Sequence, residues 1–289
     1  MQVEAFGKIN WSLDILGVNE AGYHLMDMLM QPVSLADEIT LSPAEEVTLT
    51  TAGFPPVRAD PKNLAWRAAV ALREMTGTAR GASIHLLKRI PVGAGLGGGS
   101  ADAAAVLLGL NRLWDLSLSE RELEQIGLTL GADVPFCLRG GLTRTRGIGE
   151  MLEDLPCHGG FWLVLCQPCR GLSTREVFSA WSSQDVQKRP DTASAITALA
   201  EGDLPGLAEA IDNVLQPVSV RKRPEIGEAI ACLEAHGALR ALMTGSGSAV
   251  FGVFRTRSDA GNAFRILSRR WRSTFLCHTQ MDSVRIHET

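Results

Sequence analysis

Glycine is concentrated in one short stretch of this chain. Residues 93–99 contain five glycines in seven positions, and Ser100 follows them. The stretch lies between a strand-like run at 83–87 and a helix-like run at 101–108. Glycine lets the backbone turn sharply and brings its N–H groups close to a ligand, and a helix start adds unpaired N–H donors with a partial positive charge. The stretch therefore predicts a site that binds phosphate.

Two other glycine motifs fit this stretch less well. Gly93, Gly95 and Gly98 match the dinucleotide fingerprint G-x-G-x-x-G, which needs an acidic residue about 20 positions on, at the end of the next strand. Asp115 is near that distance, but it follows the tail of the same helical pattern. The P-loop pattern needs a lysine directly before Ser100, and the chain has none there. A structural loop without a ligand is the remaining alternative.

Phosphoryl transfer also needs a carboxylate at the acceptor hydroxyl and a cation at the moving group. Asp133 is a candidate for the carboxylate, because it follows a predicted helix end and precedes Pro135, which fixes the chain. An Asp in such a place can instead bond its own backbone in a turn. Lys8 is a candidate for the cation. It stands in an apolar run of β character, where a lysine lies at an exposed edge or faces a partner.

Several motifs follow one another in a characteristic order. They are Lys8-Ile9-Asn10, Gly22-Tyr23-His24, the glycine-rich stretch at 91–100, residues 130–136 and the late loop Thr244-Gly245-Ser246-Gly247. In this order they resemble the GHMP kinases, and more narrowly the branch of that family that acts on a CDP-linked methylerythritol. The resemblance spans almost the whole chain. It implies an enzyme that uses ATP and Mg²⁺ to phosphorylate the 2-hydroxyl of the methylerythritol part, in the non-mevalonate route to isoprenoid precursors.

The resemblance also assigns roles at the nucleotide. Lys8 is expected to pair with Asp133 and with the phosphoryl group, and Asp133 either takes the proton or orients the hydroxyl. Ser100 is a possible Mg²⁺ ligand, a role compatible with capping the helix, and no metal ligand is certain. Asp102 is expected to lie in the first helical turn as a structural residue. The expected ATP-binding residues are Pro91, Gly93, Gly95, Leu96, Gly97, Gly98, Gly99 and Ser100.

The acceptor side is assigned to Asn10, Tyr23, His24, Phe178 and Gly245. Tyr23 is the only tyrosine of the chain, and aromatic faces suit a flat base such as cytosine. Phe178 has a simpler alternative as a core residue. Asn10 is expected to contact the methylerythritol hydroxyls or the phosphoryl group, or to satisfy local backbone instead.

Two other functions stay open. One is another GHMP kinase for a small alcohol, of the homoserine or mevalonate type. Tyr23 and His24 argue against it, because those alcohols have no base to stack. The other is a non-catalytic sensor on the same fold, and the presence of both Lys8 and Asp133 argues against it.

The elements that must position these residues have an α+β pattern. Apolar spacing predicts a helix at 64–75, and the capping box of Ser119 and Glu122 opens another that ends near Gly131. Further helices are expected near 193–200, 207–215 and 225–236, strands at 47–50, 161–165 and 249–254, and a surface loop at 182–189.

A loop at 156–160 suggests a division of the chain. We expect an N-terminal ATP-binding domain at 1–155 and a C-terminal domain at 156–289. The resemblance implies two α/β lobes, an ATP-binding lobe and a substrate lobe, with the active site in the cleft between them.

Composition excludes several classes of protein. The 289 residues carry a formal net charge of −4 and no dense block of Lys and Arg, so nucleic-acid binding is not favoured. No apolar run is long enough for a membrane span, and no signal peptide is visible. Six scattered cysteines indicate reduced thiols in the cytoplasm. Cys166 and Cys169 form a C-x-x-C without the second pair or His partners of a zinc site. The partner that the resemblance implies is a small-molecule substrate, the CDP-linked methylerythritol.

Overall fold

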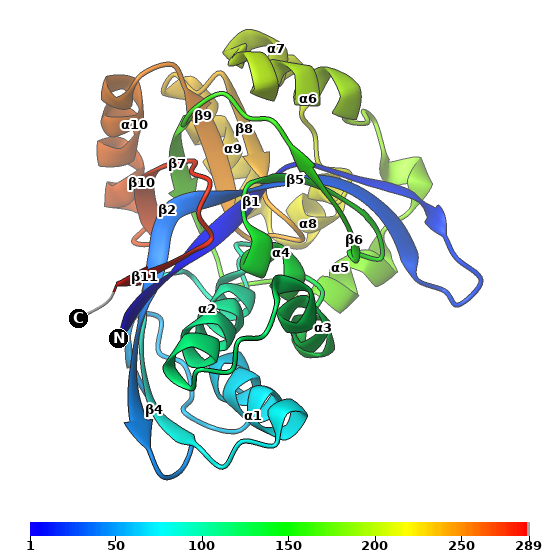
Figure 1. The fold of residues 1–289 in the computed structure, drawn as a ribbon. Helices are drawn as coiled ribbons and strands as arrows, with labels where there is room; N and C mark the ends of the chain where they lie inside the picture. The colour runs from blue at the N-terminus through cyan, green and yellow to red at the C-terminus, as the bar shows by residue number, and fades with distance from the viewer. Residues whose placement is uncertain (288–289) are drawn as a thin grey trace.

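The computed structural model describes residues 1–287, and its first lobe is built on a large mixed sheet (Figure 1). The strands run in the order β11-β1-β2-β4-β3, and β5 joins β2 to β6. Among these pairs only β3 and β4 are parallel. The strands are β1 (Gln2–Val18), β2 (His24–Ala44), β3 (Thr48–Gly53), β4 (Gly81–Lys88), β5 (Leu142–Gly147), β6 (Met151–Leu155) and β11 (Val284–His287).

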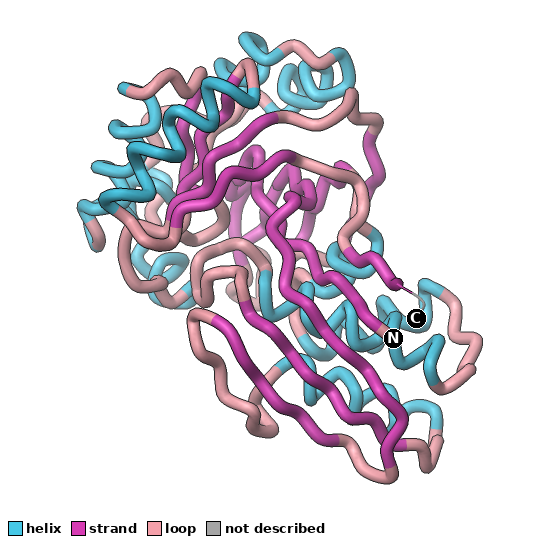
Figure 2. Tube along the Cα trace, turned by 90° about the vertical axis from the view of Figure 1, so that its left-hand side faces the viewer, coloured by secondary structure: helices cyan, strands magenta, loops and turns pink. Residues whose placement is uncertain are grey.

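Helices pack on one side of this sheet (Figure 2). They are α1 (Leu64–Thr76), α2 (Gly98–Leu113), α3 (Glu120–Leu130) and α4 (Val134–Arg139). The predicted capping box of α3 is present, with Ser119 and Glu122 bonding each other's backbone N–H groups. Small side chains let α2 lie close to the strands, since its run of alanines at 103–105 is fully buried. The chain passes from β4 into α2 through the glycine-rich stretch, so this packing fixes both ends of that loop.

A four-stranded antiparallel sheet forms the second lobe, in the order β10-β7-β9-β8. Its strands are β7 (Trp162–Cys166), β8 (Arg240–Met243), β9 (Val250–Phe254) and β10 (Thr274–His278). The helices of this lobe are α5 (Thr174–Ala180), α6 (Thr192–Glu201), α7 (Leu204–Ala210), α8 (Gln216–Lys222), α9 (Pro224–Ala235) and α10 (Arg257–Arg270), with a short 3₁₀ turn η1 (Ser183–Asp185). The two-lobed α+β architecture expected from the sequence is confirmed.

Aromatic packing joins the two lobes. Trp11 on β1 is fully buried, and its ring meets Phe161 and Phe251 edge-on, each at 5.6 Å between centroids. Its indole N–H donates to Gln31 Oε1 at 2.8 Å. The first sheet is thereby packed against the second, and the chain later returns to it, because β11 pairs with β1.

Some expected elements differ from those observed. The helix expected at 207–215 is wrong in its second half, because α7 ends at Ala210 and Pro217 lies near the start of a separate helix, α8. Between them, Asn213 bridges to Leu13 of β1. The loop expected at 182–189 contains the turn η1. The division at residue 155 stays a prediction.

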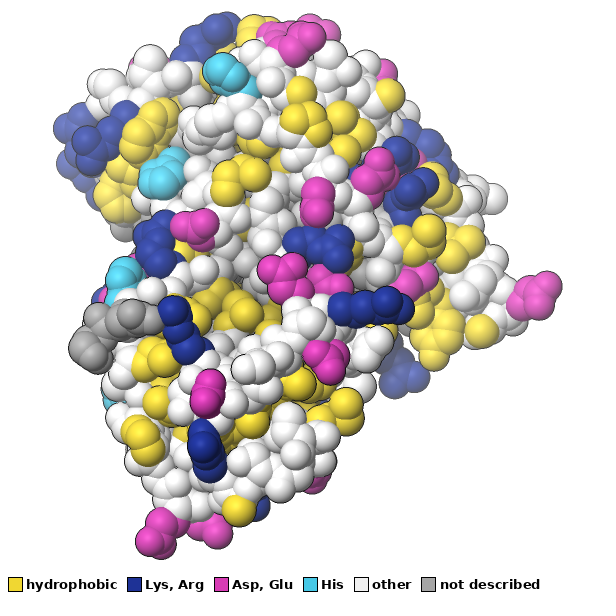
Figure 3. Space-filling model, viewed as in Figure 1, with side chains coloured by type: hydrophobic (Ala, Val, Ile, Leu, Met, Phe, Trp, Pro, Cys, Tyr) yellow, Lys and Arg dark blue, Asp and Glu magenta, His cyan; other side chains and the backbone are white. Residues whose placement is uncertain are grey.

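Acidic and basic side chains lie next to one another across the middle of the face seen in Figure 3. Ion pairs of the first lobe include Arg139 with Glu124 at 2.8 Å and Arg146 with Glu153 at 3.2 Å. Within residues 1–287, every helix is too short or too polar to span a bilayer.

Candidate active site

The glycine-rich loop between β4 and α2 depends on backbone that other residues rarely adopt. Gly93, Gly95 and Gly97 have φ values of +64°, +80° and +68°. Gly95 also lies against the late loop, where a Cβ atom would stand 2.2 Å from the carbonyl oxygen of Thr244. Ala101 donates the first helical hydrogen bond, to Gly97, so the N–H groups just before it have no partner inside the helix. They are therefore available to an anion.

The start of α2 corrects two expectations. The N-cap of α2 is Gly97, so Ser100 lies within the first turn and is not the cap. Asp102 falls beyond the first turn, where it is buried and pairs with Lys88. Asp115 lies in a turn after α2 and not at a strand end, in agreement with the rejection of the dinucleotide fingerprint.

Lys8 and Asp133 lie together although 125 positions separate them in sequence. The Lys8 side chain is 5% exposed, and its Nζ lies 3.5 Å from Asp133 Oδ2. Nζ also donates to Asn10 Oδ1 at 2.7 Å. A β-bulge between Phe6 and Lys8 interrupts the β1–β2 register, and the Lys8 N–H donates instead to Leu96 O at 2.9 Å. The bulge thus attaches this part of β1 to the glycine-rich loop.

Asp133 leaves its carboxylate available. It occupies the N-cap position of α4, yet its side chain accepts no capping hydrogen bond. The alternative of a turn aspartate bonded to its own backbone is therefore not what the structure shows. The side chain is 36% exposed, so one of its sides faces Lys8 and the other faces open space.

The late loop at 244–247 packs against Asn10 and the glycine-rich loop. Asn10 N–H donates to Thr244 Oγ1 at 2.9 Å. A Cβ atom on Gly245 would lie 3.2 Å from the Cα of Gly95 and 3.5 Å from Asn10 Oδ1, so Gly245 contacts both. Asn213 stabilises the loop, because its side-chain amide donates to the carbonyl oxygens of Met243 and Gly245 at 2.8 Å each.

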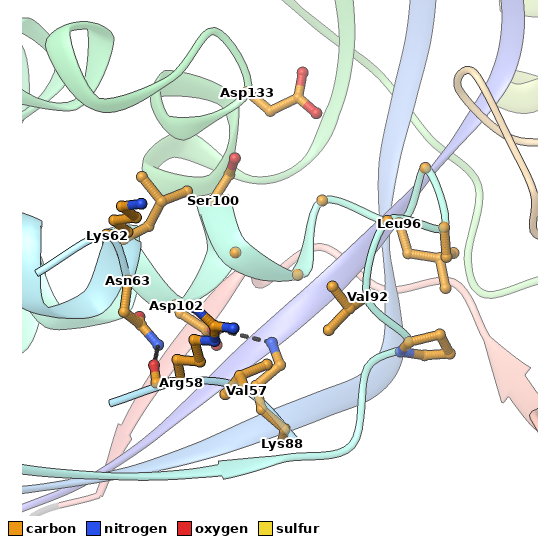
Figure 4. A pocket seen from close by; sticks show the side chains of 18 of the residues that line it. Val57, Arg58, Lys62, Asn63, Lys88, Val92, Leu96, Ser100, Asp102 and Asp133 are labelled. Atoms are coloured by element: carbon orange, nitrogen blue, oxygen red, sulfur yellow. Dashed lines mark hydrogen bonds and ion pairs between the residues drawn. The ribbon is translucent and has the colours of Figure 1, made fainter. Parts of the chain in front are cut away.

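A cavity of about 630 Å³ opens over the glycine-rich loop. All eight residues expected to bind ATP line it, together with Asp133 and with Thr174 from the second lobe. In Figure 4, Ser100 lies between Asp133, at one end, and Asn63 and Arg58, at the other. The wall opposite the glycines was not predicted from the sequence. It consists of Val57, Arg58, Asp60, Lys62, Asn63 and Leu64.

A buried charged cluster borders the same cavity. Lys88 Nζ pairs with Asp37 and lies 2.7 Å from Asp102 Oδ2. Burial raises the pKa of Asp102, and the neighbouring Asp37 raises it further, against the lowering effect of Lys88. Burial lowers the pKa of Lys88, but the two carboxylates outweigh it and the net shift is upward.

The aromatic residues expected at the acceptor lie on two elements. His24 begins β2, and its ring is 5.2 Å from Phe178 of α5 and 5.8 Å from Trp181. Phe178 is half-buried and packs against the core, which is the simpler alternative, and its assignment to the acceptor stays a prediction. Tyr23 stands on the β1–β2 turn, 60% exposed, and its N–H donates to Asn19 Oδ1 at 2.9 Å. The sequence did not single out Trp181, whose ring meets that of His24 edge-on.

The two thiols of the C-x-x-C pair form no disulfide. All six cysteines are free, and burial raises the pKa of the Cys166 thiol to about 12. Within residues 1–287, no three His, Cys, Asp or Glu side chains gather as metal ligands.

The glycine-rich loop, the Lys8–Asp133 pair and the two-lobed fold define a kinase of the GHMP class. Family models for the GHMP kinases N terminal domain and the GHMP kinases C terminal match residues 63–141 and 195–273. The chain therefore belongs to the GHMP kinases, and its relatives narrow the family further.

A 4-diphosphocytidyl-2-C-methyl-D-erythritol kinase of Alkaliphilus metalliredigens is 42% identical, over 96% of this chain and 95% of that protein. The same enzyme of Symbiobacterium thermophilum is 44% identical over 93% and 95%. The crystal structure of a 4-(cytidine 5'-diphospho)-2C-methyl-D-erythritol kinase matches with a TM-score of 0.84 and 35% identity, over 96% of this chain and 99% of that one. The chain belongs to the 4-diphosphocytidyl-2-C-methyl-D-erythritol kinase family.

Homoserine kinase from Cytophaga hutchinsonii shares the fold. It has a TM-score of 0.76, 18% identity and coverage of 99% and 96%. At that identity the likeness shows only the architecture.

Proposed function

We propose that this chain transfers the γ-phosphoryl group of ATP to the 2-hydroxyl of 4-diphosphocytidyl-2-C-methyl-D-erythritol. The observation that carries the proposal is the Lys8–Asp133 pair, 3.5 Å apart, of which Asp133 lines the same cavity as the glycine-rich loop. A carboxylate for the acceptor and a cation for the phosphoryl group are the parts that this chemistry requires. The family of the relatives supplies the identity of the acceptor.

ATP fits the cavity in one direction. The free N–H groups at the start of α2 favour the triphosphate at the glycine-rich loop, with the γ-phosphoryl toward Asp133. The base and ribose then lie along the unpredicted wall, near Val57, Asn63 and Leu64. Arg58 and Lys62 on that wall add positive charge beside the phosphates.

Asp133 acts on the acceptor hydroxyl, and Lys8 acts on the transferred phosphoryl group. The Asp133 carboxylate accepts a hydrogen bond from the acceptor hydroxyl and so orients its oxygen toward the γ-phosphorus. The Lys8 ammonium, held by Asn10 and Asp133, stabilises negative charge on the transferred group. Because both side chains are placed by the folded backbone, little reorganisation is needed when the substrates bind.

Mg²⁺ fits the same end of the cavity. This ion usually keeps phosphate oxygens and waters as ligands and takes only one or two oxygens from the protein. Ser100 and Asp133 offer one hydroxyl and one carboxylate there (Figure 4). When bound, the ion neutralises charge on the phosphates.

The acceptor's cytosine is assigned to Tyr23, His24 and Phe178. The rings of His24 and Phe178, tilted by 53° to each other, offer aromatic faces, and the exposed Tyr23 stands on the adjoining turn. Asn10 and Gly245, beside Lys8, are assigned to the methylerythritol end. A division near residue 155 is supported by the two family models, which lie on either side of it. The cytoplasm suits an ATP-dependent enzyme with six free thiols.

An assay of ADP release tests the proposal. The purified chain is given ATP and Mg²⁺ with the CDP-linked methylerythritol, homoserine, mevalonate or galactose in parallel. We expect ADP release with the CDP-linked substrate and at least a hundredfold lower kcat/KM with the others, because they carry no base for His24 and Phe178. Equal or higher activity on another alcohol would reassign the substrate, and ATP binding without turnover of any alcohol would favour a sensor.

A further inference from the structure

Three charged side chains meet beneath the glycine-rich loop and take no part in the chemistry described above. Asp37 lies on β2, Lys88 ends β4, and Asp102 lies on α2. Their relative exposures are 0%, 3% and 3%. Lys88 Nζ contacts both carboxylates. Burying three charges is costly unless each is paired and hydrogen-bonded, so the cluster needs an explanation.

Asp37 holds the entry to the loop. Its Oδ1 accepts hydrogen bonds from the backbone N–H groups of Arg89 at 2.6 Å and Ile90 at 2.9 Å. These two residues connect β4 to the glycine-rich loop. A carboxylate that accepts two backbone N–H groups and an ammonium is held in one orientation, and it holds those residues in turn.

Lys88 and Asp102 hold the exit from the loop. Asp102 extends from α2, the helix that the loop enters. A Cβ atom on Gly98, the first residue of α2, would lie 3.3 Å from Lys88 Nζ and 2.8 Å from Ile90 Cγ2. The helix start therefore rests directly on the ammonium and on the residue that Asp37 fixes, so both ends of the loop are attached to one cluster.

We propose that Asp37, Lys88 and Asp102 are positioning residues that fix the two ends of the glycine-rich loop and so make its N–H groups converge on the nucleotide phosphates. This inference rests on the proposed function. Lys88 and Asp102 line the edge of the cavity, but Asp37 is fully buried and does not line it, so Asp37 acts on the nucleotide only through the loop. Its loss weakens ATP binding and leaves the acceptor site unchanged.

The test is ATP affinity, measured by calorimetry without the acceptor. In Asp37→Asn the shape is kept, but one side of the group becomes an N–H donor facing other donors. We expect the Kd for ATP to rise about tenfold, on the scale of one lost charged hydrogen bond. The KM of the acceptor should stay within twofold. An ATP Kd within twofold of the wild type would overturn the proposal.

Asp27→Asn is the matched control. Asp27 lies on the same strand, is 5% exposed, and accepts hydrogen bonds from Arg144 Nε and Nη2 at 2.8 Å each. Its partner Arg144 belongs to β5, which does not adjoin the glycine-rich loop in sequence. We expect its loss to lower Tm while ATP affinity is unchanged. An equal loss of ATP affinity in both variants would show that the effect is only general destabilisation and would overturn the proposal.

Two variants of Asp102 provide a second test if Asp37→Asn does not fold. Asp102 Oδ1 has no hydrogen-bond partner within the described chain, so Asp102→Asn can keep an acceptor for Lys88 without losing a bond. Asp102→Ala removes the acceptor. We expect ATP affinity to fall less than threefold in the first and about tenfold in the second. Equal affinities would overturn the proposal, whereas a wild-type chain that binds no ATP would contradict the proposed function instead.

Discussion

At the scale of the residue, the distinctive feature is a lysine buried in the middle of a strand. Lys8 is 5% exposed, and its two partners are Asn10 and Asp133. A buried ammonium is costly unless it is paired, and only one of these partners is charged. The position is thus suited to a further negative group, such as a phosphoryl oxygen, and folding aligns the ammonium before any substrate arrives.

Asp133→Asn should separate catalysis from binding. The amide preserves the shape of the side chain but removes the charge that receives the acceptor hydroxyl. Loss of such a group costs about 10²–10⁴-fold, so we expect kcat to fall by about that factor, in steady-state assays, with ATP affinity nearly unchanged. Near-normal kcat would remove Asp133 from the mechanism.

Tyr23→Ala should affect only the acceptor. Base–aromatic stacking contributes about 1–3 kcal/mol, so we expect the KM for the CDP-linked substrate to rise about tenfold while the KM for ATP stays the same. Leu16→Ala is the control, because Leu16 lies on the same hairpin with 63% exposure, against 60% for Tyr23. A raised KM for ATP with an unchanged acceptor KM would contradict the assignment of this face to cytosine.

At the scale of the element, the glycine-rich loop and Lys8 prove to be in contact. A Cβ atom on Gly97 would lie 3.0 Å from Lys8 Cγ, whereas one on Gly93 would meet only Gly171 Cα at 3.6 Å. The two glycines have similar positive φ, +68° and +64°. An alanine at either position would therefore cause similar backbone strain. The two substitutions differ only in the atoms that the added methyl group would meet.

Gly97→Ala and Gly93→Ala form a matched pair. Both should weaken ATP binding through backbone strain. Only Gly97→Ala pushes against Lys8, so only that variant should also lower kcat, by about tenfold or more. Rates at saturating ATP measure this difference. Equal kcat values in the two variants would show that the contact with Lys8 has no effect on catalysis.

Local patterns predicted the elements where one segment determines its own structure. The helix expected at 64–75 is α1, and the Ser119 capping box opens α3 as expected. The helix expected at 207–215 failed because Asn213 bonds to carbonyl oxygens 30 and 32 positions away. No local pattern contains such a partner.

The same distinction between local and distant partners separates the site residues that the sequence predicted by itself from those that it did not. The glycine-rich loop is contiguous, and its spacing alone indicated phosphate. Lys8 and Asp133 meet only through the fold, and their pairing was inferred from the family resemblance. The cavity wall at Arg58 and Asn63 had no sequence signal beyond two polar residues in a loop, so it was not found.

At the scale of the whole molecule, one aromatic cluster holds the lobes together. Trp11 belongs to the first sheet, and Phe251 to the second. Both are fully buried. The lobes are thus expected to unfold together, since neither can expose its side of the cluster alone.

Trp11→Ala tests this coupling. Truncating a buried tryptophan costs about 3–5 kcal/mol, and it also leaves Gln31 Oε1 without its donor. We expect Trp11→Ala to have a lower Tm than the wild type. We also expect the wild type to unfold in a single calorimetric transition. Two separate transitions in the wild type would show that the lobes are independent.

The pairing of β11 with β1 links the order of synthesis to the order of folding. The register pairs Gln2 with His287, and β11 lies beside the first part of β1 (Figure 1). During synthesis β1 precedes β11, so the edge of β1 that pairs with β11 has no partner until β11 has left the ribosome. An unpaired edge can pair with another chain. Neighbouring nascent copies are therefore expected to be most vulnerable to misassociation until β11 has paired with β1, and a chaperone that covers this edge of β1 would protect them.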